Sequence, residues 1–483
     1  MQNKTDNADT INLNNDKVLG DFVRVASWNI GRGLNFDNIL LMFENSDKFL
    51  AISEETGGRD KRPDKAELTE IAKQIEILKS TDIFLLNEVD IGMPRTKYRN
   101  IAEEFAKMLG YNYAFGVEFV EVDPAHLGLE EHKWSEENIL FPDKEYVVDK
   151  TKYKGLHGNA IISRYPIKNA RIIRLPDYYG WFEKEKNKIA KFEVARREAA
   201  DIVFKENVIR EIRRGSRIAL VADIEIPGMD KPLTVVSVHL ENRVVPKYRH
   251  KQIKYLLNEI KEVKNPLVMA GDLNTSTRDG SPTSIYREVK KKITDPDFLA
   301  RQAINATVPY SYIFAPASSG VNFIRKRNDP LVMNIPVVLP NKEKKLFDEI
   351  EDMEFADGGE FDFSGKKYRS INNRGNTLSS SNERGLMGFV PTYQFNRDLY
   401  IGQFKLDWIF VKPCEDCEDD ENDDNRIKPF TPYFGRTLFE LNYALNPPIS
   451  DHVPITVDLP LNPPNKKQIK KIIKTEKKEK SAL

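Results

Sequence analysis

Short stretches of apolar side chains, separated by turn residues, predict the strands of this chain. In residues 21–30 apolar and polar positions alternate, and residues 82–88 and 265–270 are short apolar runs typical of buried strands. Further strands are predicted at residues 111–122, 155–167, 217–226, 233–239, 404–411 and 449–457. Predicted strands are therefore spread over nearly the whole chain.

Apolar residues at helical spacing predict helices between these strands. Apolar positions recur on one face from Leu68 to Leu78, and Asp64 and Glu67 have the spacing of a capping box, which predicts a helix over residues 64–78. Other helices are predicted at residues 36–43, 98–109, 181–214 and 248–260. The stretch 181–214 is rich in charge, which favours a solvated helical face.

The order of these elements predicts a layered α/β architecture with mixed sheets. Length alone favours about three domains. However, polar residues at strand ends come from nearly the whole chain, so a single site would need nearly the whole chain. We therefore predict one domain over residues 21–461, preceded by a disordered tail over 1–20 and followed by a lysine-rich tail over 462–483. Insertions into this domain are predicted near residues 123–155, 181–214 and 276–404.

Composition and charge exclude several classes of protein. Lys and Arg together number 74, as do Asp and Glu, so the net charge indicates no polyanionic partner. Two cysteines exclude a disulfide scaffold, and the acidic segment around Cys414 and Cys417 predicts a solvated loop. No apolar run reaches the roughly 18 residues of a transmembrane segment. The first twenty residues also lack an apolar signal core, so we predict a cytoplasmic protein.

Polar side chains with catalytic potential stand where the predicted strands end. Asp272 and Asn274 follow an apolar run and a glycine, and in an extended segment side chains two apart point to the same face. In open α/β folds, chemistry collects where loops leave the sheet. The strand-end residues are Asn29, Glu88, His239, Asp272, Asn274, Asp407, Asp451 and His452.

With these residues, the chain resembles the endonuclease/exonuclease/phosphatase superfamily of metal-dependent phosphoesterases. Each matching segment is short, but seven of them occur in the family's order over about residues 22–460. They are Ser27-Trp28-Asn29-Ile30, Leu86-Asn87-Glu88-Val89, Gly158-Asn159-Ala160-Ile161-Ile162-Ser163-Arg164, Val238-His239-Leu240, Gly271-Asp272-Leu273-Asn274, Leu406-Asp407-Trp408-Ile409 and Ser450-Asp451-His452. The resemblance implies a four-layer α/β sandwich, in which two mixed β-sheets pack face to face with helices on the outside.

The resemblance also implies roles for individual residues. Glu88 resembles the metal-binding glutamate, with Asn29 and Asp451 beside it, and such oxygen ligands suit Mg²⁺, or Mn²⁺ in its place. Asp272 resembles the residue that orients or deprotonates the attacking water, and Asn274 a hydrogen-bond donor to the phosphoryl oxygens. The remaining assignments are His452 as the essential histidine bonded to Asp407, His239 against the phosphate, and His157 and Asn159 as substrate-binding residues. Whether Asp272 or His452 is the general base stays open.

These roles predict a phosphodiesterase or nuclease that uses a divalent metal and an activated water for in-line attack on phosphorus. Its partner would be a phosphoester substrate, with nucleic acid as one candidate, and we expect a monomer. The Glu88-Val89-Asp90 sequence resembles bacterial-type members of unassigned substrate. A lipid or inositol-phosphate phosphoesterase and a non-catalytic binding module that kept the fold are the alternatives.

Overall fold

The computed structural model describes residues 21–57, 62–122, 151–185, 212–275, 344–363, 392–396, 401–415 and 428–462. Seven strands from these residues form a first sheet in the order β13-β14-β1-β2-β4-β3-β6. Strand β1 pairs in parallel with β2, and all other neighbours are antiparallel. The strands are β1 (Phe22–Arg32), β2 (Ile83–Ile91), β3 (Asn112–Val122), β4 (Lys154–Ser163), β6 (Ile212–Gly215), β13 (Tyr433–Thr437) and β14 (Ile455–Pro460).

A second sheet contains five of the described strands in the order β12-β9-β8-β7-β5. Here β8 and β9 are parallel and the other neighbours are antiparallel. The strands are β5 (Ile167–Arg174), β7 (Ile218–Ile224), β8 (Leu233–His239), β9 (Leu267–Asp272) and β12 (Asp407–Lys412). A separate pair consists of β10 (Tyr393–Asn396) and β11 (Ile401–Phe404).

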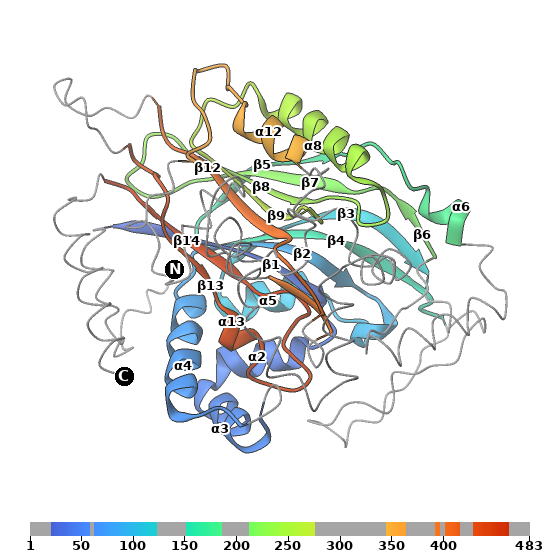
Figure 1. Ribbon diagram of the computed structural model, residues 1–483, viewed down its shortest axis with the longest axis vertical. Coiled ribbons are helices and arrows are strands. Elements are labelled where there is room, and N and C mark those ends of the chain that lie inside the picture. Colours follow the sequence, from blue (N-terminus) through green and yellow to red (C-terminus); the bar gives the residue numbers. More distant parts are fainter. Residues whose placement is uncertain are drawn as a thin grey trace, which may run out of the picture.

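Helices cover the outer face of each sheet, so that four layers are stacked (Figure 1). The first sheet is covered by α2 (Phe36–Glu44), α3 (Ser46–Thr56), α4 (Lys65–Lys79), α5 (Ile101–Leu109) and α13 (Phe439–Asn442). The second is covered by α8 (Pro246–Ile260) and α12 (Lys344–Glu351). Two short elements, η1 (Pro94–Thr96) and α6 (Trp181–Glu185), complete the described structure.

Buried apolar side chains of the described residues form a cluster between each pair of neighbouring layers. The central cluster joins the two sheets directly, with Val25 and Leu85 from the first and Val235, Val268 and Ile409 from the second. Burial of this apolar area is the main force that holds the sheets together. The predicted four-layer sandwich with two mixed sheets is thus confirmed.

Local signals predicted many of the elements, but helices α3, α12 and α13 were not predicted. The capping box at the start of α4 forms as expected, with reciprocal bonds between Asp64 and Glu67. Helix α3 was missed because it buries only Phe49 and Ser53, which leaves little apolar periodicity. Its start depends on Asn45, whose side chain accepts a hydrogen bond from the Lys48 backbone N–H.

The predicted helix over residues 181–214 is wrong at its C-terminal end. Residues 212–215 form strand β6, which pairs with β3. The charge of Arg213 suggested a solvated helix, but its guanidinium lies 3.5 Å from the Trp181 ring centroid and 4.2 Å from that of Phe119. Such cation–π contacts allow a charged residue to be buried in a strand. Helix α6 occupies only residues 181–185, and residues 186–211 lie outside the described structure.

Part of the predicted insertion 276–404 belongs to the core. Leu346, Phe347 and Ile350 of α12 join the cluster over the second sheet, and the ring of Phe347 lies 4.7 Å from that of Trp408. This part of the predicted insertion therefore covers the outer face of the second sheet. The predicted N-terminal tail, residues 463–483 of the C-terminal tail and most of the insertion 123–155 lie outside the described residues.

Two further findings concern the exposure of Cys414 and the helices of the described residues. Cys414 is 1% exposed, so the prediction of a solvated loop is wrong at this position, and Cys417 lies outside the described residues. Across the described ranges, no helix combines the length and apolar character needed to cross a membrane.

Candidate active site

The sheet registers bring the predicted strand-end residues to one edge of the sandwich. In the first sheet, Asn29 of β1 lies opposite Asn87 of β2. In the second, Asp272 lies between Asp407 on one neighbouring strand and His239 on the other. Hydrogen bonds join the two edges, because Asn29 Nδ2 donates to Asp272 Oδ2 over 3.1 Å and the Asp272 backbone N–H donates to Asn87 Oδ1 over 2.8 Å.

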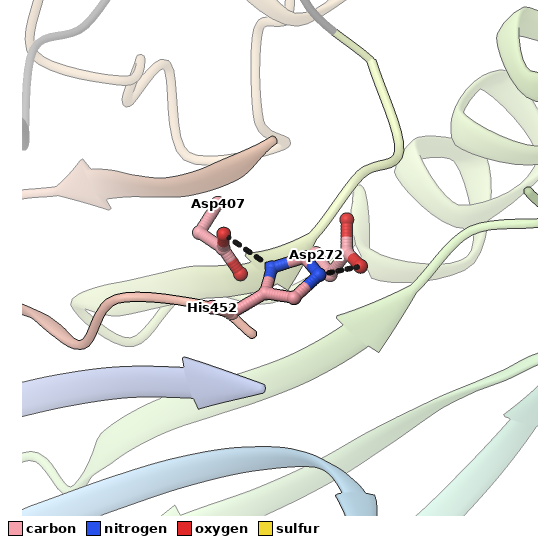
Figure 2. Close-up of side chains that lie close together, drawn as sticks. All are labelled: Asp272, Asp407 and His452. Atoms are coloured by element: carbon pink, nitrogen blue, oxygen red, sulfur yellow. Dashed lines mark hydrogen bonds and ion pairs between the residues drawn. The ribbon is translucent and has the colours of Figure 1, made fainter. Parts of the chain in front are cut away.

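His452 lies between two carboxylates in the loop that precedes β14 (Figure 2). Its Nδ1 donates to Asp407 Oδ2 over 2.8 Å, and its Nε2 lies 3.7 Å from Asp272 Oδ2. Trp28 Nε1 donates to the His452 carbonyl oxygen over 3.1 Å, which fixes the backbone against β1. The ring is therefore oriented with Nε2 toward Asp272.

This arrangement shifts the pKa values of Asp272 and His452. Burial raises the pKa of Asp272 to about 7; Asp407 adds to the rise, and His452 opposes it. Burial alone would lower the pKa of His452, but the carboxylates of Asp407 and Asp272 raise it well above 6.5. A carboxyl group with a pKa near neutral thus stands beside a histidine whose neighbours favour its protonated form, and such a pair has the residue types used in general acid–base catalysis.

The backbone around Asp272 has no room for larger residues. Gly271 has φ +148°, and a Cβ there would lie 1.9 Å from the Val238 carbonyl oxygen. Asn274 has φ +48°, its backbone N–H donates to Asp272 Oδ1 over 2.7 Å, and its Nδ2 donates to the Leu240 carbonyl oxygen over 3.1 Å. An amide has two N–H donors, so Asn274 keeps a second one for a ligand.

Glu88, Asn29 and Asp451, the three predicted metal ligands, come from three adjacent chain segments of the first sheet. Glu88 follows Asn87 on β2 with φ +52°, and its side chain is 18% exposed. Asp451 is exposed, and its neighbour Ser450 ties it to β1, because Ser450 Oγ contacts both Asp451 Oδ1 at 3.2 Å and the Asn29 carbonyl oxygen at 2.8 Å. Positive φ at a residue other than glycine stores strain that is concentrated at functional sites.

A second set of metal-ligand types exists in the described structure. Asp272, Asp407 and His452 bring one ligand atom each within 4.8 Å of one another. Two of these side chains already bond each other, since His452 Nδ1 donates to Asp407. That bond occupies His452 Nδ1 and leaves Nε2 facing Asp272.

His239 is completely buried between Arg217 and the acidic residues. Its Nδ1 lies 2.8 Å from Arg217 Nη1. Its Nε2 lies 3.6 Å from Asp272 Oδ2 and 4.0 Å from Glu88 Oε1, and has no hydrogen-bond partner among the described residues. Burial and the charge of Arg217 lower the pKa of His239 well below 6.5. His239 and His452 therefore differ in charge state within one site.

The structure places His157 and Asn159 behind this group rather than within it. Asn159 Oδ1 accepts a hydrogen bond from Asn87 Nδ2 over 3.0 Å, and its Nδ2 donates to the Ile218 carbonyl oxygen over 3.3 Å. His157 is 1% exposed and bonds Asp90 over 2.8 Å. Direct substrate binding by either residue stays a prediction. The Asn159 contact reaches Asp272 through Asn87, whereas the His157 contact is with Asp90.

Sequence reasoning did not assign a role to Asn87, Glu118 or Arg217. Asn87 lies inside a matching motif and links β2 to the Asp272 backbone, so its position beside Glu88 was an available signal. Glu118 and Arg217 pair over 2.9 Å beneath His239, and each lies in a predicted strand without a motif. Only their contact across the two sheets identifies them.

Comparison with known proteins gives the family. The sequence profile described as Endonuclease/Exonuclease/phosphatase family matches residues 26–452. The chain belongs to this family. A search of curated protein sequences found no match. The site residues from Asn29 to His452 all lie within the matched range, which spans both sheets.

A search of solved structures finds several that are similar to this chain. An endonuclease/exonuclease/phosphatase from Beutenbergia cavernae is 14% identical with a TM-score of 0.39, over 91% of this chain and 72% of that chain. A 3'-5' exonuclease from Neisseria meningitidis is 12% identical with a TM-score of 0.39, over 90% and 99% of the two chains. An endonuclease/exonuclease/phosphatase from Bacteroides vulgatus is 13% identical with a TM-score of 0.39, over 92% and 100%.

Proposed function

We propose that this protein is a divalent-metal-dependent phosphodiesterase or nuclease that hydrolyses its substrate with an activated water. The observation that carries the proposal is the position of His452 between Asp407 and Asp272, at 2.8 and 3.7 Å, on an edge that also presents buried donors. Phosphoester hydrolysis requires a positioned water and stabilisation of charge on the phosphoryl oxygens. Side chains that can position a water and side chains that can stabilise this charge both lie at this edge.

The residues proposed as metal ligands fit a hard cation. Glu88 and Asp451 supply carboxylate oxygens and Asn29 a carboxamide oxygen, which are donors that Mg²⁺ and Mn²⁺ prefer. Asp451 Oδ1 lies so close to the end of β1 that a Cβ on Gly31 would come within 2.9 Å of it. When bound, such a cation supplies charge neutralisation at a phosphoryl oxygen.

The chain's own side chains then divide the remaining tasks. Asp272 and His452 Nε2 present a carboxylate and a ring nitrogen 3.7 Å apart, so one can take a proton from water while the other holds or supplies one. Asp407 keeps the His452 ring in place and balances its positive charge. Asn274 and His239 supply N–H donors for phosphoryl oxygens.

The test uses the full chain and a chromogenic phosphodiester, bis(p-nitrophenyl) phosphate. We expect release of nitrophenol with Mg²⁺, loss of release with a chelator, and loss in Asp272→Asn. Asp223→Asn is the matched control, because this carboxylate accepts from Thr234 at the opposite end of the strands and should leave the rate unchanged. Equal rates with and without chelator, or in Asp272→Asn, would contradict the proposal.

A second series of substrates separates the substrate classes. Single-stranded and duplex oligonucleotides represent the nuclease that we favour, and an inositol phosphate and a phosphodiester lipid represent the alternatives. A kcat/KM at least tenfold higher for an oligonucleotide would support the nuclease assignment. A kcat/KM at least tenfold higher for the inositol phosphate or the lipid would contradict the nuclease assignment and support the corresponding alternative.

A further inference from the structure

The two histidines of the site have partners of opposite kinds. His452 Nδ1 bonds the carboxylate of Asp407, whereas His239 Nδ1 lies 2.8 Å from a guanidinium nitrogen of Arg217. Glu118 Oε2 lies 3.7 Å from the same nitrogen of His239, too far for a hydrogen bond. A guanidinium has hydrogen-bond donors and no acceptor. In the contact between Arg217 and His239, Arg217 must therefore donate and Nδ1 must accept. The proton of the His239 ring is then on Nε2.

Arg217 is held in this orientation by buried carboxylates. Its Nη1 donates to Glu118 Oε2 over 2.9 Å, and its Nε lies 3.8 Å from Glu241 Oε2. The side chains of Arg217 and Glu118 are at most 1% exposed. If Arg217 turned away, Glu118 would be left as a buried charge without its partner, which is strongly unfavourable. The guanidinium therefore stays against His239.

The other ring nitrogen of His239 faces the reaction centre. Its Nε2–H lies 3.6 Å from Asp272 Oδ2, too far for a hydrogen bond, and within the described part of the chain it has no partner. A buried donor without a partner is costly, and such groups are rare unless a ligand or water completes them. An oxygen of a bound ligand would complete this one.

We propose that Arg217, oriented by Glu118, is a positioning residue that fixes His239 as a neutral Nε2–H donor to a phosphoryl oxygen. The proposal rests on the proposed function for the identity of that oxygen, but not for the position of the proton. No proton leaves His239 in this role, since loss of the Nε2 proton would give an imidazolate anion. His239 differs from His452 at Nδ1: both Nε2 atoms face Asp272 Oδ2, at 3.6 and 3.7 Å, but the Nδ1 of His452 is paired with a carboxylate and that of His239 with a guanidinium.

The first test locates the proton directly, without turnover. Long-range ¹H–¹⁵N spectra of the full chain report which imidazole nitrogen is protonated, and the His239→Gln spectrum identifies the His239 signals. We expect the Nε2–H form in the wild type and a mixture of both neutral forms in Arg217→Met. Arg171→Met, which removes an exposed arginine from the same sheet, should leave the pattern unchanged.

Two results would overturn the proposal. One is an Nδ1–H or doubly protonated ring in the wild type. The other is an unchanged Nε2–H pattern in Arg217→Met. If Arg217→Met fails to fold because Glu118 is left unpaired, the double variant Arg217→Met/Glu118→Gln removes both charges and is measured in its place.

The second test separates positioning from a general structural role by a double-mutant cycle in kcat/KM. Arg217→Met should lower kcat/KM for bis(p-nitrophenyl) phosphate by about 10²-fold, as expected for loss of one oriented donor. In a His239→Gln background, where no tautomer needs fixing, the same substitution should cost less than about threefold. Equal losses in both backgrounds would overturn the proposal. If no variant and no wild type hydrolyses the ester, the proposed function fails while the spectra still decide the tautomer.

Discussion

The buried charged groups at the two ends of strand β1 have different kinds of neighbours. Near its beginning, Arg24 Nε bonds Asp458 Oδ1 over 2.7 Å, and Arg436 Nη2 lies 2.8 Å from Asp458 Oδ2. Near its other end, Asn29 contacts a site in which the carboxylates of Asp272 and Asp407 share a single histidine. Charges are matched by opposite charges at the first end and crowded by like charges at the second.

The pKa values show what this difference does. Burial alone would raise the pKa of Asp458, but Arg24 and Arg436 hold it below 3.8. Burial raises the pKa of Asp272 to about 7, and Asp407 adds to that rise. Ionisable groups with strongly raised pKa values in one cluster are typical of catalytic sites, whereas matched pairs of buried charges are typical of structural ones. We therefore expect substitutions at the two ends to affect different properties.

The largest effect is expected for His452→Ala. Loss of general acid–base help should lower kcat for bis(p-nitrophenyl) phosphate by about 10²–10⁴-fold, while the midpoint of thermal unfolding changes little. His250→Ala is the control, because this half-buried histidine on α8 bonds Glu349 away from the site. Wild-type turnover in His452→Ala with Mg²⁺ present would show that the acid–base assignment is wrong.

At the other end of β1, Arg24→Met should affect stability instead of turnover. It leaves Asp458 with one fewer cation in a buried position, which should lower the free energy of unfolding by about 3–5 kcal/mol. Urea unfolding measures the change, and kcat per folded molecule should stay constant. Arg164→Met removes a half-exposed partner of Asp82 and should cost less than about 1 kcal/mol. Similar losses of unfolding free energy in Arg24→Met and Arg164→Met would contradict the view that the buried pair is structural in a way that the half-exposed pair is not.

Acid should weaken the same matched pair. Because the folded pKa of Asp458 is lowered, its stabilising contribution is complete above its unfolded pKa and is lost as pH falls through its folded pKa. The unfolding free energies of wild type and Asp458→Asn should therefore differ by about 3 kcal/mol near neutral pH. The difference should shrink below about pH 4. A constant difference from neutral pH to about pH 3 would mean that the contribution of Asp458 is not ionic.

The smallest effect is expected at the start of α4, where Asp64 caps the helix. Asp64→Ala removes a side chain that accepts from the Ala66 and Glu67 backbone N–H groups, each over 2.9 Å. Loss of such a cap should lower the free energy of unfolding by about 1 kcal/mol with unchanged kcat. A lower kcat with an unchanged free energy of unfolding would show that this helix affects the site, and would contradict a purely structural role for its cap.

The fold and the location of the site were predictable from the sequence for local reasons. Apolar runs specify buried strands by themselves, and a polar residue that ends such a run is visible without a structure. This is how Asp272, Asp407 and His239 were selected, and the sheet register places them side by side. The family motifs then supplied roles that residue types alone leave open.

The features that the sequence does not predict depend on contacts between distant segments of the chain. The sequence predicts a helix where strand β6 lies, because the burial of Arg213 requires the rings of Trp181 and Phe119, which come from two other elements. The part played by Arg217 depends on His239 and Glu118, one on a neighbouring strand and one on the other sheet. Neither contact leaves a periodic signal along the chain.

The central claim is that one edge of the sandwich combines a metal site with a separate acid–base group. The most direct test is a crystal structure of the protein soaked with Mn²⁺ and inorganic phosphate, in which anomalous scattering locates the cation. We predict Mn²⁺ bound by Glu88, Asp451 and Asn29, with phosphate beside His239 and Asn274 and with the bond between His452 and Asp407 intact. A cation bound instead by Asp272, Asp407 and His452 would contradict the division of roles proposed for this site.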